Sequence, residues 1–117
     1  MAVAALLPLA ANAEAPKAEA PKAYVIAEIE VFDTADYENY KAAVVPIVAK
    51  YSGRYIIRGG QIKHIEGDAP KGRVVVLEFA NLAMAEAFLK SDEYRPVADI
   101  RHKTAKSRIM IVEGIIP

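Results

Sequence analysis

The sequence predicts an α+β domain in which strands and helical segments alternate as βαββαβ. Three observations lead to this prediction. Several short segments rich in Val, Ile and aromatic residues show the two-residue alternation of strands. Two stretches between them carry apolar residues at helical spacing. The length of 117 residues suits one domain, since two domains of half that size would each bury little core.

The first 23 residues are expected to lie outside this domain. Residues 1–13 are uncharged, too short to span a bilayer, and end in the Ala-x-Ala pattern that signal peptidases cleave. No Lys or Arg precedes this apolar run. Residues 14–23 repeat Glu-Ala-Pro-Lys-Ala twice, as in a semi-extended linker. We therefore predict a signal peptide over 1–13, a linker over 14–23 and the domain over 24–117. The protein would then be periplasmic or secreted; the alternative is a cytoplasmic protein with an unstructured terminus.

Composition argues against several classes of function. Fifteen basic residues balance fifteen acidic residues, which argues against nucleic-acid binding. The absence of cysteine excludes thiol catalysis, disulfides and thiolate metal sites. The sequence contains no glycine-rich phosphate loop and no nucleophile elbow, so nucleotide chemistry and nucleophilic hydrolysis are not expected.

Each element follows from its own local signals. Asp33 caps a helix that follows a strand over 24–32, and Pro46 predicts a kink in that helix. A second strand over 54–58 is expected to continue over 61–66 after a bulge at two glycines. Asn81 caps the next helix, and Pro96 suits the first turn of its continuation to about residue 104. The remaining strands are predicted at 73–79 and 106–113. This order is the ferredoxin-like arrangement, an antiparallel sheet with both helical segments on one face.

Both faces of the predicted sheet are apolar. Val74 and Val76 point to one face of their strand, whereas Val75, Leu77 and Phe79 point to the other, and the first and last strands share this two-sided pattern. Helices cover only one face, so a monomer would expose an unusually large apolar patch. We therefore predict a homodimer through the uncovered face. An aspartate introduced at Ile109 is expected to disrupt it.

A set of short motifs resembles a known family. In chain order they are Tyr37-x-x-Tyr40, Tyr51-Ser52-Gly53-Arg54, Arg58-Gly59-Gly60, Glu66-Gly67, Glu78-Phe79, Ser91-x-Glu93-Tyr94 and Val112-Glu113-Gly114. Together they resemble the bacterial domain-of-unknown-function family thirteen-thirty, within the dimeric α/β barrel superfamily. The resemblance covers residues 23–114. It implies a ferredoxin-like protomer whose sheet pairs face to face with that of a second copy.

The resemblance does not specify a reaction. Relatives in the superfamily include cofactor-independent monooxygenases, dye-decolourising peroxidases, haem-degrading enzymes and amino-acid-responsive regulators. The residues of this sequence must therefore indicate where any chemistry takes place.

Arg58, followed by Gly59 and Gly60, is the most suggestive local feature. Its guanidinium could hold a carboxylate or enolate beside backbone that allows close approach, or it could simply pair with a neighbouring carboxylate. Glu78 is a candidate proton shuttle if it is unpaired, because apolar neighbours would raise its pKa. If Arg58 or Arg73 pairs with Glu78, the two form a structural ion pair.

The remaining candidates are histidines, carboxylates and tyrosines. His64 is the alternative base, with an intrinsic pKa near neutrality, whereas His102 suits a helix end. Neither histidine has the spacing of a metal site, so we predict no metal and no tightly bound cofactor. Glu28 and Glu30 share the uncovered face. Tyr94 is placed in the substrate site, although this tyrosine and the other helical ones, Tyr37, Tyr40 and Tyr51, also suit the core.

The sequence thus predicts a homodimeric protein that binds or transforms a small anionic or aromatic molecule. We expect this site between the helices and the sheet or at the barrel mouth, near the Gly59–Gly60 bend. The alternatives are a non-catalytic ligand-binding or sensing module and a purely structural dimer.

Overall fold

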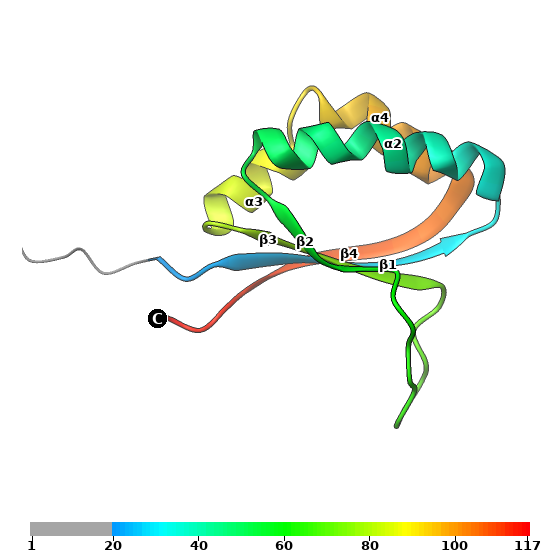
Figure 1. The fold of residues 1–117 in the computed structure, drawn as a ribbon, viewed down its shortest axis with the longest axis horizontal. Coiled ribbons are helices and arrows are strands. Elements are labelled where there is room, and N and C mark those ends of the chain that lie inside the picture. Colours follow the sequence, from blue (N-terminus) through cyan, green and yellow to red (C-terminus); the bar gives the residue numbers. More distant parts are fainter. Residues whose placement is uncertain (1–19) are drawn as a thin grey trace, which may run out of the picture.

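The computed structural model describes residues 20–117, which form one four-stranded antiparallel sheet and three helices (Figure 1). The sheet order is β2-β3-β1-β4, and the helices lie on one face of the sheet. This arrangement confirms the predicted ferredoxin-like α+β fold. The elements are β1 (Ala23–Val31), α2 (Thr34–Lys50), β2 (Arg54–Arg58), β3 (Arg73–Phe79), α3 (Leu82–Leu89), α4 (Tyr94–Thr104) and β4 (Ala105–Glu113). The predicted signal peptide and residues 14–19 of the linker lie outside the described residues.

Side-chain caps begin α2 and α3 where the sequence predicts them. A carboxylate oxygen of Asp33 accepts a hydrogen bond from the backbone N–H of Asp36 at 3.1 Å. The amide oxygen of Asn81 accepts from the N–H of Met84 at 2.9 Å. Each contact pairs one of the N–H groups that a helix leaves free at its start. α2 continues through Pro46, which has no N–H to donate within the helix.

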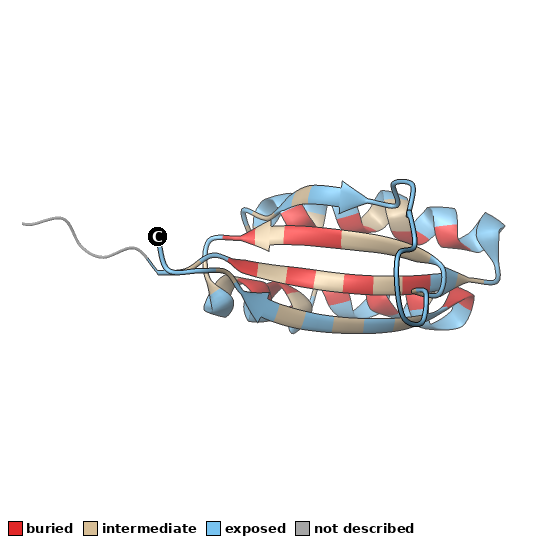
Figure 2. Cartoon of the chain, turned by 90° about the horizontal axis from the view of Figure 1, so that it is seen from below, coloured by how far each residue is buried: buried red, intermediate tan, exposed pale blue. Residues whose placement is uncertain are grey.

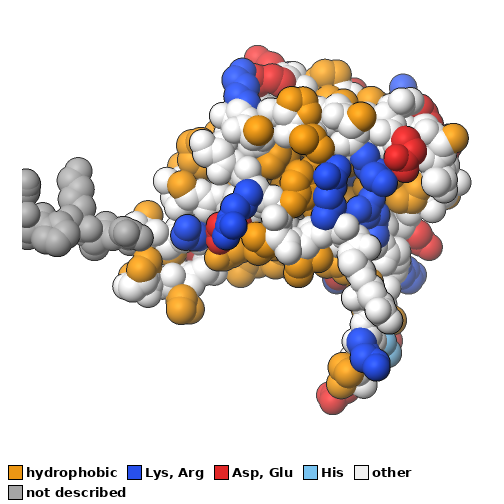
Figure 3. Space-filling model, viewed as in Figure 1, with side chains coloured by type: hydrophobic (Ala, Val, Ile, Leu, Met, Phe, Trp, Pro, Cys, Tyr) orange, Lys and Arg blue, Asp and Glu red, His pale blue; other side chains and the backbone are white. Residues whose placement is uncertain are grey.

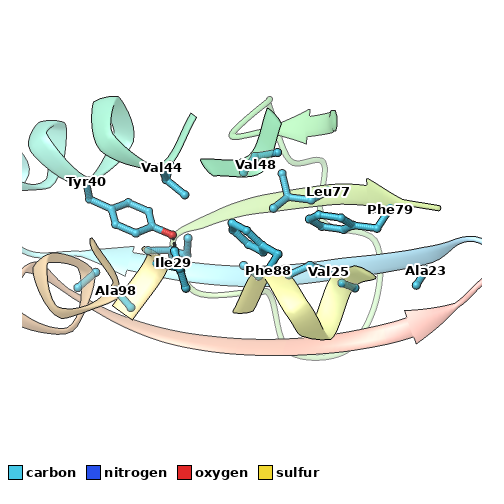
Figure 4. Close-up of a cluster of buried hydrophobic side chains, with 14 of the residues drawn as sticks. Ala23, Val25, Ile29, Tyr40, Val44, Val48, Leu77, Phe79, Phe88 and Ala98 are labelled. Carbon is cyan, nitrogen blue, oxygen red and sulfur yellow. Dashed lines mark hydrogen bonds between the residues drawn. The ribbon is translucent and has the colours of Figure 1, made fainter. Parts of the chain in front are cut away.

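The hydrophobic core fills the space between the helices and the covered face of the sheet (Figure 4). Alternate residues of β1 supply its floor: Ala23, Val25, Ala27 and Ile29 are all buried. The rings of Phe79 and Phe88 stack above them, with centroids 5.3 Å apart. The two-residue alternation along β1 therefore predicts correctly which of its side chains lie on the covered face of the sheet.

The predicted continuation of β2 over 61–66 is wrong. Residues 59–72, here called the arm, contain no strand and leave the sheet on the side away from the helices (Figure 1). Ile65 of the arm is 83% exposed. A partner strand would have to come from residues 67–72, where Pro70 has no N–H to donate to a ladder. The bulge occurs within β2 itself, where the pairing shifts between Tyr55 and Ile57.

Within residues 20–117 the helices leave the opposite face of the sheet, here called the open face, uncovered, and only the arm crosses it near one end (Figure 2). Ile26 of β1 pairs with Val76 of β3 on one side and with Met110 of β4 on the other, which forms an apolar strip across this open face. Met110 is 43% exposed. Ile109, in contrast, pairs with Ala27 on the covered face. The expectation that an aspartate at Ile109 would test the dimer is therefore wrong, and Met110 is the residue to change.

Candidate functional site

A cavity lies between α2 and the covered face of the sheet, close to the edge formed by β2. Aliphatic residues of β1 and β3 form its floor, and aromatic rings from helices and strands form its walls. It contains about 500 Å³ of unfilled space when its opening to solvent is included, while the part that admits the centre of a water molecule measures about 40 Å³. The smaller figure counts only the positions of a water molecule's centre, so the space that bound atoms can occupy is larger than this figure. The aromatic lining residues are Tyr37, Tyr40, Tyr55, Phe88 and Tyr94.

Three cationic side chains line this cavity, and none of its lining residues is acidic. They are Lys41 of α2, Arg58 at the end of β2 and Arg73 at the start of β3. Neither arginine forms an ion pair within residues 20–117, and Arg73 Nε is buried there without a hydrogen-bond partner. Figure 3 shows Lys and Arg side chains gathered beside hydrophobic ones on this side of the molecule. Lys41 forms an ion pair with Glu38 at 3.2 Å, so the charge that the described residues do not neutralise is that of the two arginines.

Aromatic rings hold the two arginines in place. The guanidinium carbon of Arg58 lies 4.4 Å from the ring centroid of Tyr55, and that of Arg73 lies 5.8 Å from the centroid of Tyr37. Such contacts position a guanidinium over a ring face without using its N–H donors. The donors of Arg58 and the buried Nε of Arg73 thus remain available to an anion.

Gly59 has a specific structural role beside Arg73. Its φ is +70°, and a Cβ at this position would lie 2.6 Å from a terminal guanidinium nitrogen of Arg73. Its N–H also donates to the carbonyl of Val74 at 2.9 Å. A Cβ on Gly60, in contrast, would meet nothing within 4 Å. Of the predicted glycine pair, Gly59 provides the close approach, and the group that approaches is Arg73.

Two buried tyrosines meet at the wall of the cavity. The hydroxyls of Tyr40 and Tyr94 are 2.8 Å apart and share a hydrogen bond. Tyr40 reaches from α2 toward Ile29 of β1 (Figure 4). Burial raises the pKa of Tyr40 above its ordinary value, so its hydroxyl stays protonated at any physiological pH. The guanidinium of the buried Arg101 lies 5.9 Å from the centroid of the Tyr40 ring.

Glu78 does not lie in this cavity. It pairs with Arg54 across β2 and β3 on the open face, whereas Arg58 pairs with Val75 on the covered face. Arg54 Nε donates to its carboxylate at 2.8 Å, and the hydroxyl of Tyr24 donates at 3.0 Å. These hydrogen bonds, that from Arg54 first, lower the pKa of Glu78 despite its partial burial. Glu78 therefore forms an ion pair with Arg54 on the open face. Arg58 and Arg73 are the partners considered from the sequence, and Glu78 pairs with neither of them.

The histidines lie apart from the cavity. His64 is exposed on the arm. His102 is exposed on α4, with its Nδ1 3.7 Å from a carboxylate oxygen of Asp99. Within residues 20–117 no three His, Cys, Asp or Glu side chains come close enough to hold a metal ion together. The proton shuttle predicted from the sequence requires Arg58, Glu78 and His64 in one cavity. Within a single chain the three side chains do not meet in one cavity.

Comparison with known families adds to this geometry. A family model described as a domain of unknown function, DUF1330, matches residues 22–115. The chain belongs to the DUF1330 family. A search of curated proteins finds no match to it. Within residues 20–117 of this DUF1330 protein, no helix is long and apolar enough to cross a membrane.

Solved structures share the fold at low sequence identity. A protein of unknown function from Rhodopseudomonas palustris is 14% identical, with a TM-score of 0.66 over 91% of this chain and 89% of its own. SnoaB, a cofactor-independent oxygenase from Streptomyces nogalater, is 14% identical, with a TM-score of 0.59 over 82% and 95%. A dimeric protein of ferredoxin-like fold from Bacteroides fragilis is 17% identical, with a TM-score of 0.56 over 80% and 96%. At these identities the likeness establishes the fold alone.

Sequence reasoning missed two cations of the DUF1330 cavity, Arg73 and Lys41. Arg73 was considered only as a partner for Glu78. The alternation of β3 contains the necessary signal, because Arg73 lies two residues before Val75 and four before Leu77 on the covered face. No sequence signal places Lys41 at the opening, since that depends on how α2 packs across the sheet.

Proposed function

We propose that this DUF1330 domain binds a small organic anion in the cavity between α2 and the sheet. The observation that carries the proposal is the unneutralised charge of Arg58 and Arg73 beside an apolar, aromatic lining. A partly buried guanidinium without a counterion is costly, and a carboxylate satisfies it with two parallel hydrogen bonds. The apolar walls would surround the organic part of the same molecule.

Binding without a tightly held cofactor is the simplest form of this function. Burial raises the pKa of Tyr37 and Tyr55, as it does that of Tyr40, so the hydroxyls at the cavity are proton donors rather than bases. If turnover occurs, these groups would stabilise an anionic oxygen of the substrate. A binding or sensing module without turnover uses the same contacts, and measurement of product after prolonged incubation separates the two. A purely structural dimer would not bind the anion at all.

The test is a nuclear magnetic resonance titration of the full chain with benzoate. We expect benzoate to shift backbone resonances of residues around Arg58, Arg73 and Tyr94, and its neutral analogue benzamide to cause little change. Benzoate has the two properties that the cavity indicates, a planar apolar body and a carboxylate. Shifts confined to the open face, or equal shifts with benzamide, would contradict the proposal.

We also propose that the protein is a homodimer through its open face. Its centre is the apolar strip of Ile26, Val76 and Met110, and ion pairs such as Glu28–Arg108, with 2.7 Å between nitrogen and oxygen, lie on the same face. An apolar centre with a polar rim is the usual anatomy of a protein interface. The B. fragilis protein of similar fold is described as dimeric, which supports the same arrangement here.

Export is a separate proposal that rests on residues 1–13. Their apolar composition and the Ala11–Asn12–Ala13 motif support a cleaved signal peptide. Amino-terminal sequencing of the protein recovered from a Gram-negative host should begin at Glu14. Recovery of the intact chain from the cytoplasm would contradict the proposal and leave the function of the domain unaffected.

A further inference from the structure

We propose that the anion bound in this cavity also carries an oxo group, which accepts a hydrogen bond from the Tyr40–Tyr94 hydroxyl pair while its carboxylate binds Arg58 and Arg73. This inference rests on the proposed anion binding and specifies the class of ligand: an aromatic or otherwise planar oxo-carboxylate.

The hydroxyls of Tyr40 and Tyr94 together have one more hydrogen to donate than their mutual contact uses. Each tyrosine hydroxyl has one hydrogen to donate. The Tyr40 and Tyr94 oxygens lie 2.8 Å apart, so one hydroxyl donates to the other and uses one of the two hydrogens. The structure gives the second hydrogen no acceptor among residues 20–117. Both side chains are buried, and an unused buried donor is costly.

The neighbouring polar group cannot supply this acceptor. Arg101 is 6% exposed and lies beneath the Tyr40 ring, and a guanidinium has donors only. Its Nε is itself buried without a partner among the described residues. The positive charge of Arg101 also strengthens the tyrosine hydroxyls as donors. The wall of the cavity therefore requires an acceptor oxygen, which a carbonyl group of a ligand provides.

The two polar regions differ in what they select. Arg58 and Arg73 are charged at any workable pH and favour a carboxylate. The tyrosine pair offers a hydroxyl donor, which a ketone oxygen satisfies without bringing a second charge that would lose its hydration. The rings of Tyr37, Tyr55 and Phe88 lie along the same cavity and favour a planar body. A ligand with a carboxylate and an oxo group on one planar frame satisfies the arginines, the tyrosine pair and the aromatic rings together.

A calorimetric titration of the full chain with matched probes tests this inference. The probes are 4-acetylbenzoate and 3-acetylbenzoate, which place the oxo group at two separations from the carboxylate, and 4-isopropylbenzoate and 3-isopropylbenzoate, which replace the oxygen by a methyl group. Neutral 1,4-diacetylbenzene controls for the carboxylate. We expect one acetyl probe to bind at least about tenfold more tightly than its isopropyl analogue, since a buried donor loses its acceptor in the latter.

The variant that removes both donors is Tyr40→Phe/Tyr94→Phe, because either single change leaves one hydroxyl free to donate. We expect this double variant to lose the preference for the acetyl probe and to retain binding of the isopropyl probe. Tyr51→Phe is the matched control, since its hydroxyl donates to Glu93 at 3.0 Å and does not line the cavity.

The outcomes separate this inference from the proposed function. Equal affinity of the wild-type protein for acetyl and isopropyl probes would overturn the inference. It would indicate that water, rather than a ligand oxygen, accepts the hydrogen bond of the Tyr40–Tyr94 pair. A double variant that keeps the preference would also overturn it. Failure of every carboxylate probe to bind, or equal binding of the neutral diketone, would instead refute the anion site itself. The comparison of probes on wild-type protein is decisive even if the double variant does not fold.

Discussion

Met110→Asp is expected to convert the protein from dimer to monomer at micromolar concentration. Met110 lies on the edge strand β4, on the open face and opposite Ile26, so dimerisation would bury the new carboxylate among apolar side chains. A cost of about 3 kcal/mol or more would raise the dissociation constant at least about a hundredfold. Light scattering of the wild type and the variant measures this directly.

The control for this substitution is Val45→Asp. Val45 is 39% exposed, comparable to Met110, but it lies on α2 in the helical layer. Its replacement by aspartate should leave the mass of the dimer unchanged. A wild-type protein that is monomeric at micromolar concentration, or two aspartate variants that behave alike, would contradict the interface on the open face.

Gly72→Ala should lower the free energy of unfolding by about 2–5 kcal/mol. This figure adds the cost of holding an alanine in the left-handed backbone region to the cost of overpacking its methyl group. Gly72 has a φ of +77°, and a Cβ there would lie 2.1 Å from the backbone oxygen of Ile29. Backbone cannot rotate away as a side chain can, so β3 would have to separate from β1. The melting temperature should fall by about 10 °C or more.

Gly67→Ala isolates the packing contribution. Gly67 has a nearly identical φ of +75°, but a Cβ there would meet nothing within 4 Å. Its replacement should cost only the backbone strain, about 1–2 kcal/mol. Thermal or denaturant unfolding of the two variants compares the effects. Equal losses of stability would show that the close approach of Gly72 to β1 is not a constraint on the fold.

Much of this fold could be predicted from local sequence patterns. The alternation in β1 and β3 identifies both strands and their covered faces, and Asp33 and Asn81 mark the starts of two helices. The arm could not be predicted, because Gln61–Glu66 has a strand-like composition but no partner strand. Whether a segment joins a sheet depends on its neighbour, and Pro70 lies in the segment that would have to pair with it.

The candidate site could be predicted only in part. The location between helices and sheet and the presence of Arg58 and Tyr94 agree with the cavity found here. Glu78 could not be assigned, because its partner Arg54 follows from the register of β2 against β3, which includes a bulge. The pairing of Tyr40 with Tyr94 joins residues 54 positions apart on separate helices. Such contacts depend on tertiary packing and leave no local signal.

The most direct test of the anion site is a calorimetric titration of benzoate into the wild-type protein, Arg73→Gln and Arg54→Gln. Both substitutions remove one arginine charge and keep a polar side chain. Arg73 lines the cavity, whereas Arg54 forms an ion pair with Glu78 on the open face. We predict at least about tenfold weaker binding in Arg73→Gln, since a charge-assisted hydrogen bond is lost, and wild-type affinity in Arg54→Gln. Equal affinity in all three proteins, or no binding of benzoate to any of them, would contradict the site.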